Sequence, residues 1–184
     1  SFAALLTVGP LDFKREVIES QKIASRIADH PFEKVALAER LVNGKAVFEH
    51  AGLVILESLH LYSQSNDPHP HSHKTILNIA VRQDGATGHI RSREFYEELK
   101  VVRAIYDAEL AYQIRTRLGL AVTPLEKRGF TVDGISEEVC RAFSTRRAQI
   151  EDEVQRRGAE NPKAFSYAAK STRPDKTILS QEAL

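Results

Sequence analysis

Residues 60–78 read HLYSQSNDPHPHSHKTILN and hold four of the seven histidines of the chain. His71 and His73 are two positions apart, so on a β-strand their side chains point to the same face. His60 ends an apolar run, AGLVILESLH, and a polar loop with two prolines separates it from that pair. If the apolar runs on either side of the loop pair as antiparallel strands, His60 comes level with His71 and His73. The stretch therefore predicts a hairpin with three histidines on one face.

Three neutral imidazoles on one rigid face are ligands that a divalent transition metal prefers. Three protein ligands leave coordination positions open, which is typical of a catalytic metal site. The alternative is a scatter of surface histidines, because a single histidine is seldom a ligand. The clustering favours a divalent metal at His60, His71 and His73, and it does not distinguish Mg, Mn, Zn or Ni. His69, between the prolines, is expected to shape the loop or to contact the ligands from outside.

Composition restricts the class of protein more than its function. The chain has 184 residues, and its 26 basic and 25 acidic side chains give a net charge of +1, so bulk charge predicts no partner. A single cysteine, Cys140, excludes an intrachain disulfide framework and fits a reducing, cytoplasmic compartment. No run reaches the length of a membrane span. The absence of methionine indicates a fragment, or a sequence from which modified methionines are missing.

The chain before the motif shows helical patterns. Residues 2–8 are apolar and fit a strand end or a buried helix start. Apolar side chains at helical spacing predict an amphipathic helix over residues 12–30. A second short helix is predicted over residues 31–41, after a proline.

Strand patterns surround the motif. Asn43-Gly44 is a turn signal, and the stretch at residues 45–63 is expected to form two strands, or one strand bent at Gly52. A strand over residues 71–83 follows the histidine loop. Asp84-Gly85 then closes a hairpin with a short return strand at residues 86–92.

The second half is predicted to be mainly helical. Ser92 is a candidate N-cap for a long helix that ends at Gly119, with a core-facing stripe of Phe95, Leu99, Val102, Ile105 or Tyr106, Leu110 and Ile114. Residues 120–135 predict a small hairpin, and Ser136 begins a helix that runs to Gly158. The tail is expected to hold a short helix, a basic turn around Pro174 and the start of another helix. An antiparallel sheet with segregated helices makes the class α+β.

The histidine stretch resembles the three-histidine motif of conjugative relaxases of the TrwC/TraI type. The motif positions that match are His60, Ser63, Pro68, His71, His73 and Asn78. Three later segments also resemble this family in order: YDAELA at 106–111, AFSTRRAQIE at 142–151 and AAKSTRPDK at 168–176. Gln64 stands where the family has arginine and Tyr62 where it has threonine. These changes would either weaken DNA contacts near the metal or mark a divergent or inactive homologue.

The resemblance implies an HUH-type endonuclease palm, an antiparallel sheet with helices packed on it, that nicks one DNA strand at an origin of transfer. In that chemistry a tyrosine attacks the scissile phosphate and becomes linked to the 5′ end, while three histidines hold a divalent ion. His60, His71 and His73 match the ligands. The family's nucleophilic tyrosines and an acidic residue precede the matched region, so we expect them upstream of Ser1. Tyr62 is a weak internal candidate, and packing or DNA stacking is its expected role.

Arginines provide candidate contacts to single-stranded DNA. A charge run is usually a solvated face, but beside a relaxase-like metal site it becomes a candidate phosphate-binding wall. The candidates on a predicted helix are Arg146 and Arg147, and those after the hairpin are Arg91 and Arg93. Binding of this kind should weaken steeply with salt.

Three hypotheses follow. The favoured one is a single relaxase-like domain over residues 1–184. It is expected to be truncated at its N-terminus and also at its C-terminus, in the helical tail at residues 150–184. It would act in the cytoplasm on DNA at a conjugative origin, with a C-terminal helicase domain and conjugation accessory proteins as partners. The second is a catalytically inactive relaxase-like module that binds DNA or metal. The third is an unrelated three-histidine metallohydrolase, which would not explain the AFSTRRAQIE match.

Overall fold

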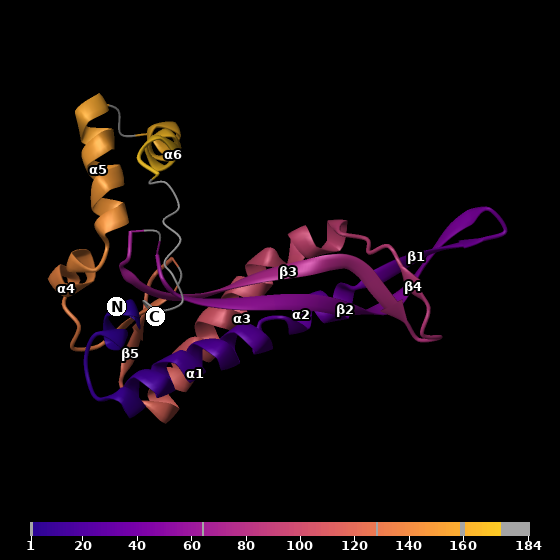
Figure 1. The fold of residues 1–184 in the computed structure, drawn as a ribbon, viewed down its shortest axis with the longest axis horizontal. Helices are drawn as coiled ribbons and strands as arrows, with labels where there is room; N and C mark the ends of the chain where they lie inside the picture. Colours follow the sequence, from indigo (N-terminus) through magenta and orange to yellow (C-terminus); the bar gives the residue numbers. More distant parts are fainter. Residues whose placement is uncertain (1, 64, 128, 159–160, 174–184) are drawn as a thin grey trace, which may run out of the picture.

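A four-stranded antiparallel sheet is the centre of the fold, in a computed structural model that describes residues 2–63, 65–127, 129–158 and 161–173. The strand order is β1-β2-β3-β4. The strands are β1 (Leu37–Val42), β2 (Lys45–Tyr62), β3 (Pro68–Arg82) and β4 (Thr87–Gly88). Three helices run along one face of the long β2–β3 ribbon (Figure 1): α1 (Leu11–Ile27), α2 (His30–Val35) and α3 (Arg93–Arg117). This arrangement confirms the predicted α+β class.

The hairpin of β2 and β3 carries the motif, and local chemistry explains its form. Asn43 and Gly44 both have positive φ, 52° and 77°, which is the backbone of the tight turn that joins β1 to β2. The second of the two predicted forms of residues 45–63 is found, because β2 is one strand. A register shift between Leu53 and Ile55 lies next to Gly52 and marks the irregular point of the strand.

The main apolar core lies between α1 and α3. Its buried members are Leu5, Val17, Ala24, Leu110, Ile114 and Val132. A second cluster joins α2 to the start of α3, where the rings of Phe32 and Phe95 meet edge to face with centroids 5.5 Å apart. Leu99, predicted to belong to the α3 stripe, is 51% exposed and lies outside both clusters. Val102 and Tyr106 do pack against these clusters, so the helical period was right along the rest of the stripe and wrong at Leu99.

The remaining elements follow α3. A small hairpin of β5 (Val122–Pro124) and β6 (Phe130–Val132) confirms the strand pair predicted there. Helices α4 (Glu137–Ala142), α5 (Thr145–Arg157) and α6 (Pro162–Ser171) stand at the end of the ribbon opposite the β1–β2 turn (Figure 1). In the part of the chain that the structure describes, no helix is long and apolar enough to cross a membrane.

Two helix predictions were wrong. Residues 31–41 were expected to be helical throughout, but α2 ends at Val35 and β1 begins at Leu37. The turn at Asn43-Gly44 brings this segment against β2, and the ladder of hydrogen bonds overrides its helical pattern. The single helix expected from Ser136 to Gly158 is divided into α4 and α5. Ser136 does cap α4, accepting a hydrogen bond from the backbone N–H of Val139 at 3.3 Å.

Smaller departures concern element ends. Phe2–Leu6 forms a short 3-10 helix, so the helical alternative applies to the apolar start. The return strand is only Thr87–Gly88, followed by a single bridge between Ala38 and Ile90. Ser92 precedes α3, but its side chain makes no capping hydrogen bond. The basic turn around Pro174 and the last predicted helix lie outside the described residues.

Candidate metal centre

The three histidines meet on one face of the β2–β3 ribbon. His60 and His71 are directly opposed in the strand register, and His73 follows two residues later on the same side of β3. Strand pairing predicted this arrangement. Ser72 and Lys74, which follow His71 and His73 in the sequence, face the other way, toward α1. The histidines therefore lie on the sheet face that α1 does not cover.

The ring nitrogens of His60, His71 and His73 converge. One nitrogen from each ring lies within 4.8 Å of the others. His71 Nδ1 is 2.6 Å from the carbonyl oxygen of His69. Because a carbonyl can only accept, Nδ1 carries the proton and Nε2 of the neutral ring keeps the lone pair. That lone pair faces Nε2 of His73 at 3.2 Å, an arrangement that suits a cation between them.

His69 contributes through its backbone. Its ring is exposed at the surface, yet the surrounding loop removes enough water to lower its pKa, and the neighbouring His71 lowers the pKa further while Asp67 opposes the shift. A lowered pKa favours the uncharged ring near neutral pH. The structure thus gives His69 the expected role of contacting a candidate ligand from outside.

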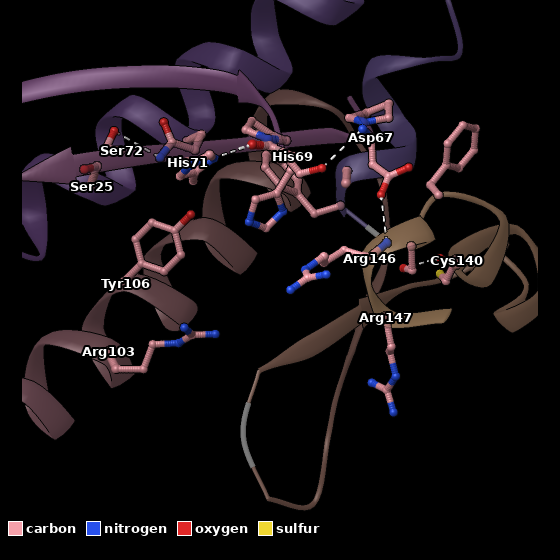
Figure 2. Close-up of a pocket in the computed structure, with 18 of the residues that line it drawn as sticks. Ser25, Asp67, His69, His71, Ser72, Arg103, Tyr106, Cys140, Arg146 and Arg147 are labelled. Atoms are coloured by element: carbon pink, nitrogen blue, oxygen red, sulfur yellow. Dashed lines mark hydrogen bonds between the residues drawn. The ribbon is translucent and has the colours of Figure 1, made fainter. Parts of the chain in front are cut away.

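A cleft of about 1080 Å³ lies beside the centre, and its lining includes His69 and His71 but neither His60 nor His73. It runs between the helix-facing side of β3 and the helices α4 to α6. Arg103 and Tyr106 reach into it from α3, and Arg146 reaches into it from α5 (Figure 2). Burial raises the pKa of Tyr106, which keeps its phenol protonated at neutral pH.

Asp67 joins the histidine loop to α5. Its carboxylate accepts hydrogen bonds from the hydroxyl of Thr145 at 2.6 Å and from the backbone N–H of Arg146 at 3.4 Å. The residue at the N-cap position, Ser144, makes no side-chain capping bond. Instead, the Ser144 hydroxyl donates to the carbonyl of Cys140 at the end of α4. Asp67, from a distant part of the sequence, therefore supplies the cap that α5 lacks.

The family model of the TrwC relaxase matches residues 1–184. The chain belongs to the TrwC relaxase family. The comparison with curated proteins found no match.

Solved structures of TrwC relaxase share this fold. A metal-bound complex of conjugative relaxase TrwC with oriT DNA has a TM-score of 0.84 and 27% identity, and the match covers 98% of this chain and 63% of that one. A copper-bound complex has a TM-score of 0.85 and 26% identity, and the match covers 100% of this chain and 64% of that one. A complex with a 27-mer DNA comprising the recognition hairpin and the cleavage site has a TM-score of 0.83 and 27% identity, and the match covers 98% of this chain and 65% of that one. The chain thus spans less than two thirds of the solved relaxases that it matches.

The four arginines named from the sequence are not gathered in one place. Arg146 and Arg147 line the cleft of this TrwC-family chain beside the histidines. The Arg146 guanidinium donates to the carbonyl and hydroxyl oxygens of Thr172 at 2.5 and 2.7 Å, and to the carbonyl oxygen of Ala169. It thereby holds the C-terminal end of α6. Arg147 has a side chain 78% exposed and pairs with Glu151 at 2.7 Å.

Arg91 and Arg93 lie at the opposite end of the ribbon, near β4 and the start of α3 (Figure 1). Arg91 stacks on the ring of Phe48 and pairs with Glu94. Arg93 is exposed and pairs loosely with Glu97 at 3.6 Å. The structure therefore does not bring this pair of arginines to the histidines.

Two other motif residues have defined places. Tyr62 is half exposed at the end of β2, and a register shift in the pairing with β3 lies between His60 and Tyr62. The Asn78 side-chain oxygen accepts from the backbone N–H of Ile90 at 3.1 Å, so this motif residue of the TrwC family fixes the return of the chain after β4.

Sequence reasoning missed the polar side chains behind the sheet and the capping role of Asp67. Gln21 and Ser25 are almost fully buried on α1, where the helical period predicted apolar residues. A spacing of four residues between Gln21, Ser25 and Asp29 was the available signal, because it places all three on one side of α1 and its C-terminal end.

Proposed function

We propose that this chain is the metal-binding core of a conjugative relaxase, which nicks one strand of DNA at an origin of transfer. The observation that supports the proposal most is the convergence of three histidine nitrogens within 4.8 Å, in a fold similar to relaxases solved with oriT DNA. The third hypothesis, an unrelated metallohydrolase, is excluded by the family.

The donor set fits a divalent ion held by His60, His71 and His73. Two nitrogens 3.2 Å apart correspond to ligands at about 2.1 Å from one ion with an angle of roughly 100° between them. The His69 carbonyl keeps the proton of His71 on Nδ1, so that Nε2 is ready to bind. When bound, the ion would act as a Lewis acid toward the oxygens of the scissile phosphate.

Single-stranded DNA would approach through the cleft that His71 lines. Arg147 would offer its exposed guanidinium to a phosphate in this cleft, and Arg103 lines the same cleft from α3. Arg146 is proposed to shape this wall through its bonds to α6. Arg91 and Arg93 would contact DNA further from the site of cleavage. Each phosphate contact should make binding fall with salt.

Strand cleavage is proposed to use a tyrosine hydroxyl. Its oxygen attacks the phosphorus, the new bond joins the tyrosine to the 5′ end of one DNA segment, and the other segment leaves with a 3′ hydroxyl. The reaction exchanges one ester for another and needs no further reactant. Such an enzyme would act in the cytoplasm, together with a helicase domain and conjugation accessory proteins.

A nicking assay with the full-length gene product tests the proposal. An oligonucleotide from the natural origin should give a covalent 5′ adduct in the presence of a divalent ion, and His71→Ala should abolish it. A Tyr62→Phe variant that nicks normally would exclude Tyr62 as the nucleophile. DNA binding without any adduct would instead favour an inactive DNA-binding module. A protein that neither binds nor nicks this DNA would contradict the proposed function.

A further inference from the structure

Behind His71 and His73, the opposite face of β3 is polar. Ser72 and Lys74 alternate with His71 and His73 and point toward α1. Ser72 accepts a hydrogen bond from the Gln21 amide at 3.2 Å. Lys74 forms an ion pair with Asp29 and donates to the backbone carbonyl of Ser25.

The neighbouring strand is attached to the same helix. Glu57 of β2 lies directly opposite Lys74, and its carboxylate accepts a hydrogen bond from the Ser25 hydroxyl at 2.8 Å. We call Gln21, Ser25 and Asp29 the α1 clamp. The clamp therefore holds both strands of the ribbon within three residues of the histidine positions.

These polar groups lie where an apolar layer would normally join a helix to a sheet. Gln21 is 1% exposed and Ser25 is 5% exposed. The side chains of Lys74 and Asp29 are 19% and 15% exposed. Burial raises the pKa of Asp29, with Lys74 opposing the shift, so burying this carboxylate as an anion carries a cost.

Buried ion pairs add little stability compared with apolar residues of similar size, and their best-attested role is to specify one register. Register matters greatly here. Because side chains alternate along a strand, a slip of one residue would turn His71 and His73 toward α1 and bring Ser72 and Lys74 to the open face.

We propose that Lys74, held by the α1 clamp, is a positioning residue that fixes His71 and His73 for metal binding. The inference rests on the proposed metal site and adds what keeps that site in register. Replacing a group that hydrogen-bonds to a metal ligand typically lowers metal affinity by about 10- to 100-fold, and we use the lower end of that range for Lys74, which acts through the strand.

The test compares Ni²⁺ affinity with stability in the same proteins. The double variant Lys74→Met/Asp29→Leu replaces the ion pair with apolar side chains of similar size. We expect its unfolding midpoint to equal or exceed that of the wild type, and its Ni²⁺ affinity by titration calorimetry to fall about 10-fold or more. Lys100→Met, an exposed change on α3, is the matched control and should leave both measurements unchanged. Lys74→Arg keeps the charge and should recover part of the affinity.

The outcomes separate the two proposals. If the wild-type chain binds no Ni²⁺, or His71→Ala binds it as well as the wild type, the proposed metal site fails. If the wild type binds Ni²⁺ at the histidines and the folded double variant binds it equally well, the positioning role is overturned. If the double variant does not fold, Ser72→Ala decides the matter, because it removes the hydrogen bonds of Ser72 to Gln21 and Glu57 and leaves the Lys74–Asp29 pair in place. A several-fold loss of affinity is then expected, and an unchanged affinity overturns the proposal.

Discussion

Replacing Asp67 with alanine should loosen α5 without unfolding the sheet. The carboxylate supplies two hydrogen bonds to the start of α5, at 2.6 Å to the Thr145 hydroxyl and at 3.4 Å to the Arg146 N–H. Loss of a helix cap typically costs about 1–2 kcal/mol. That free energy corresponds to roughly a 5- to 30-fold larger population of the open form.

Amide hydrogen exchange measures this effect element by element. In Asp67→Ala, the protected amides of α5 should exchange about 5- to 30-fold faster than in the wild type, while those of α1 and α3 change little. Thr145→Val removes the better-placed donor. A double-mutant cycle of the two changes should give a coupling free energy of about 1 kcal/mol.

Two results would refute this reasoning. One is an unchanged exchange rate in α5 of Asp67→Ala, which would mean that another group caps the helix. The other is strict additivity of Asp67→Ala and Thr145→Val, which would mean that the bond between the two side chains contributes nothing.

Three further predictions concern stability. Burial alone would raise the pKa of Glu57, but hydrogen bonds from Ser25 and Ser72 and the charges of Lys74 and Arg26 lower it overall, so this carboxylate stabilises the fold above about pH 4.5. That contribution is lost as the pH falls through the lowered pKa. Between pH 5 and pH 3, the unfolding midpoint of Glu57→Gln should therefore fall less than that of the wild type. Parallel plots of unfolding midpoint against pH for the two proteins would contradict this prediction. In Arg146→Lys, the lysine cannot reproduce the forked hydrogen bonds to α6. Limited proteolysis should therefore cut α6 sooner than in the wild type. An unchanged rate of cleavage would show that those bonds are dispensable. Ile114→Ala should lower the free energy of unfolding by about 2–5 kcal/mol in urea titration, and a loss under 1 kcal/mol would contradict its place in the core.

The candidate site was predictable because its determinants are local. A period of two along residues 71–73 and a pair of apolar runs around a polar loop were enough to bring His60 level with them. The turn at Asn43-Gly44 was equally readable, since its positive φ values require those residue types.

What the sequence did not reveal depends on contacts between distant residues. Asp67, which caps α5 after its break from α4, lies 78 positions before Thr145, and no local pattern predicts such a cap. The segment Leu37–Val42 became a strand because β2 accepts it as a partner. The spacing of four residues could place the polar residues of the α1 clamp on one side of the helix, but their partner Lys74 is identified only by the structure.

Metal stoichiometry tests the central claim most directly. The wild-type chain, dialysed against a divalent metal and analysed by elemental analysis and calorimetry, should bind one ion per chain. The single variants His60→Ala, His71→Ala and His73→Ala should each lose that ion while keeping the unfolding midpoint of the metal-free protein. Retention of one ion by all three variants, or no ion in the wild type, would contradict the assignment of these histidines as the metal centre.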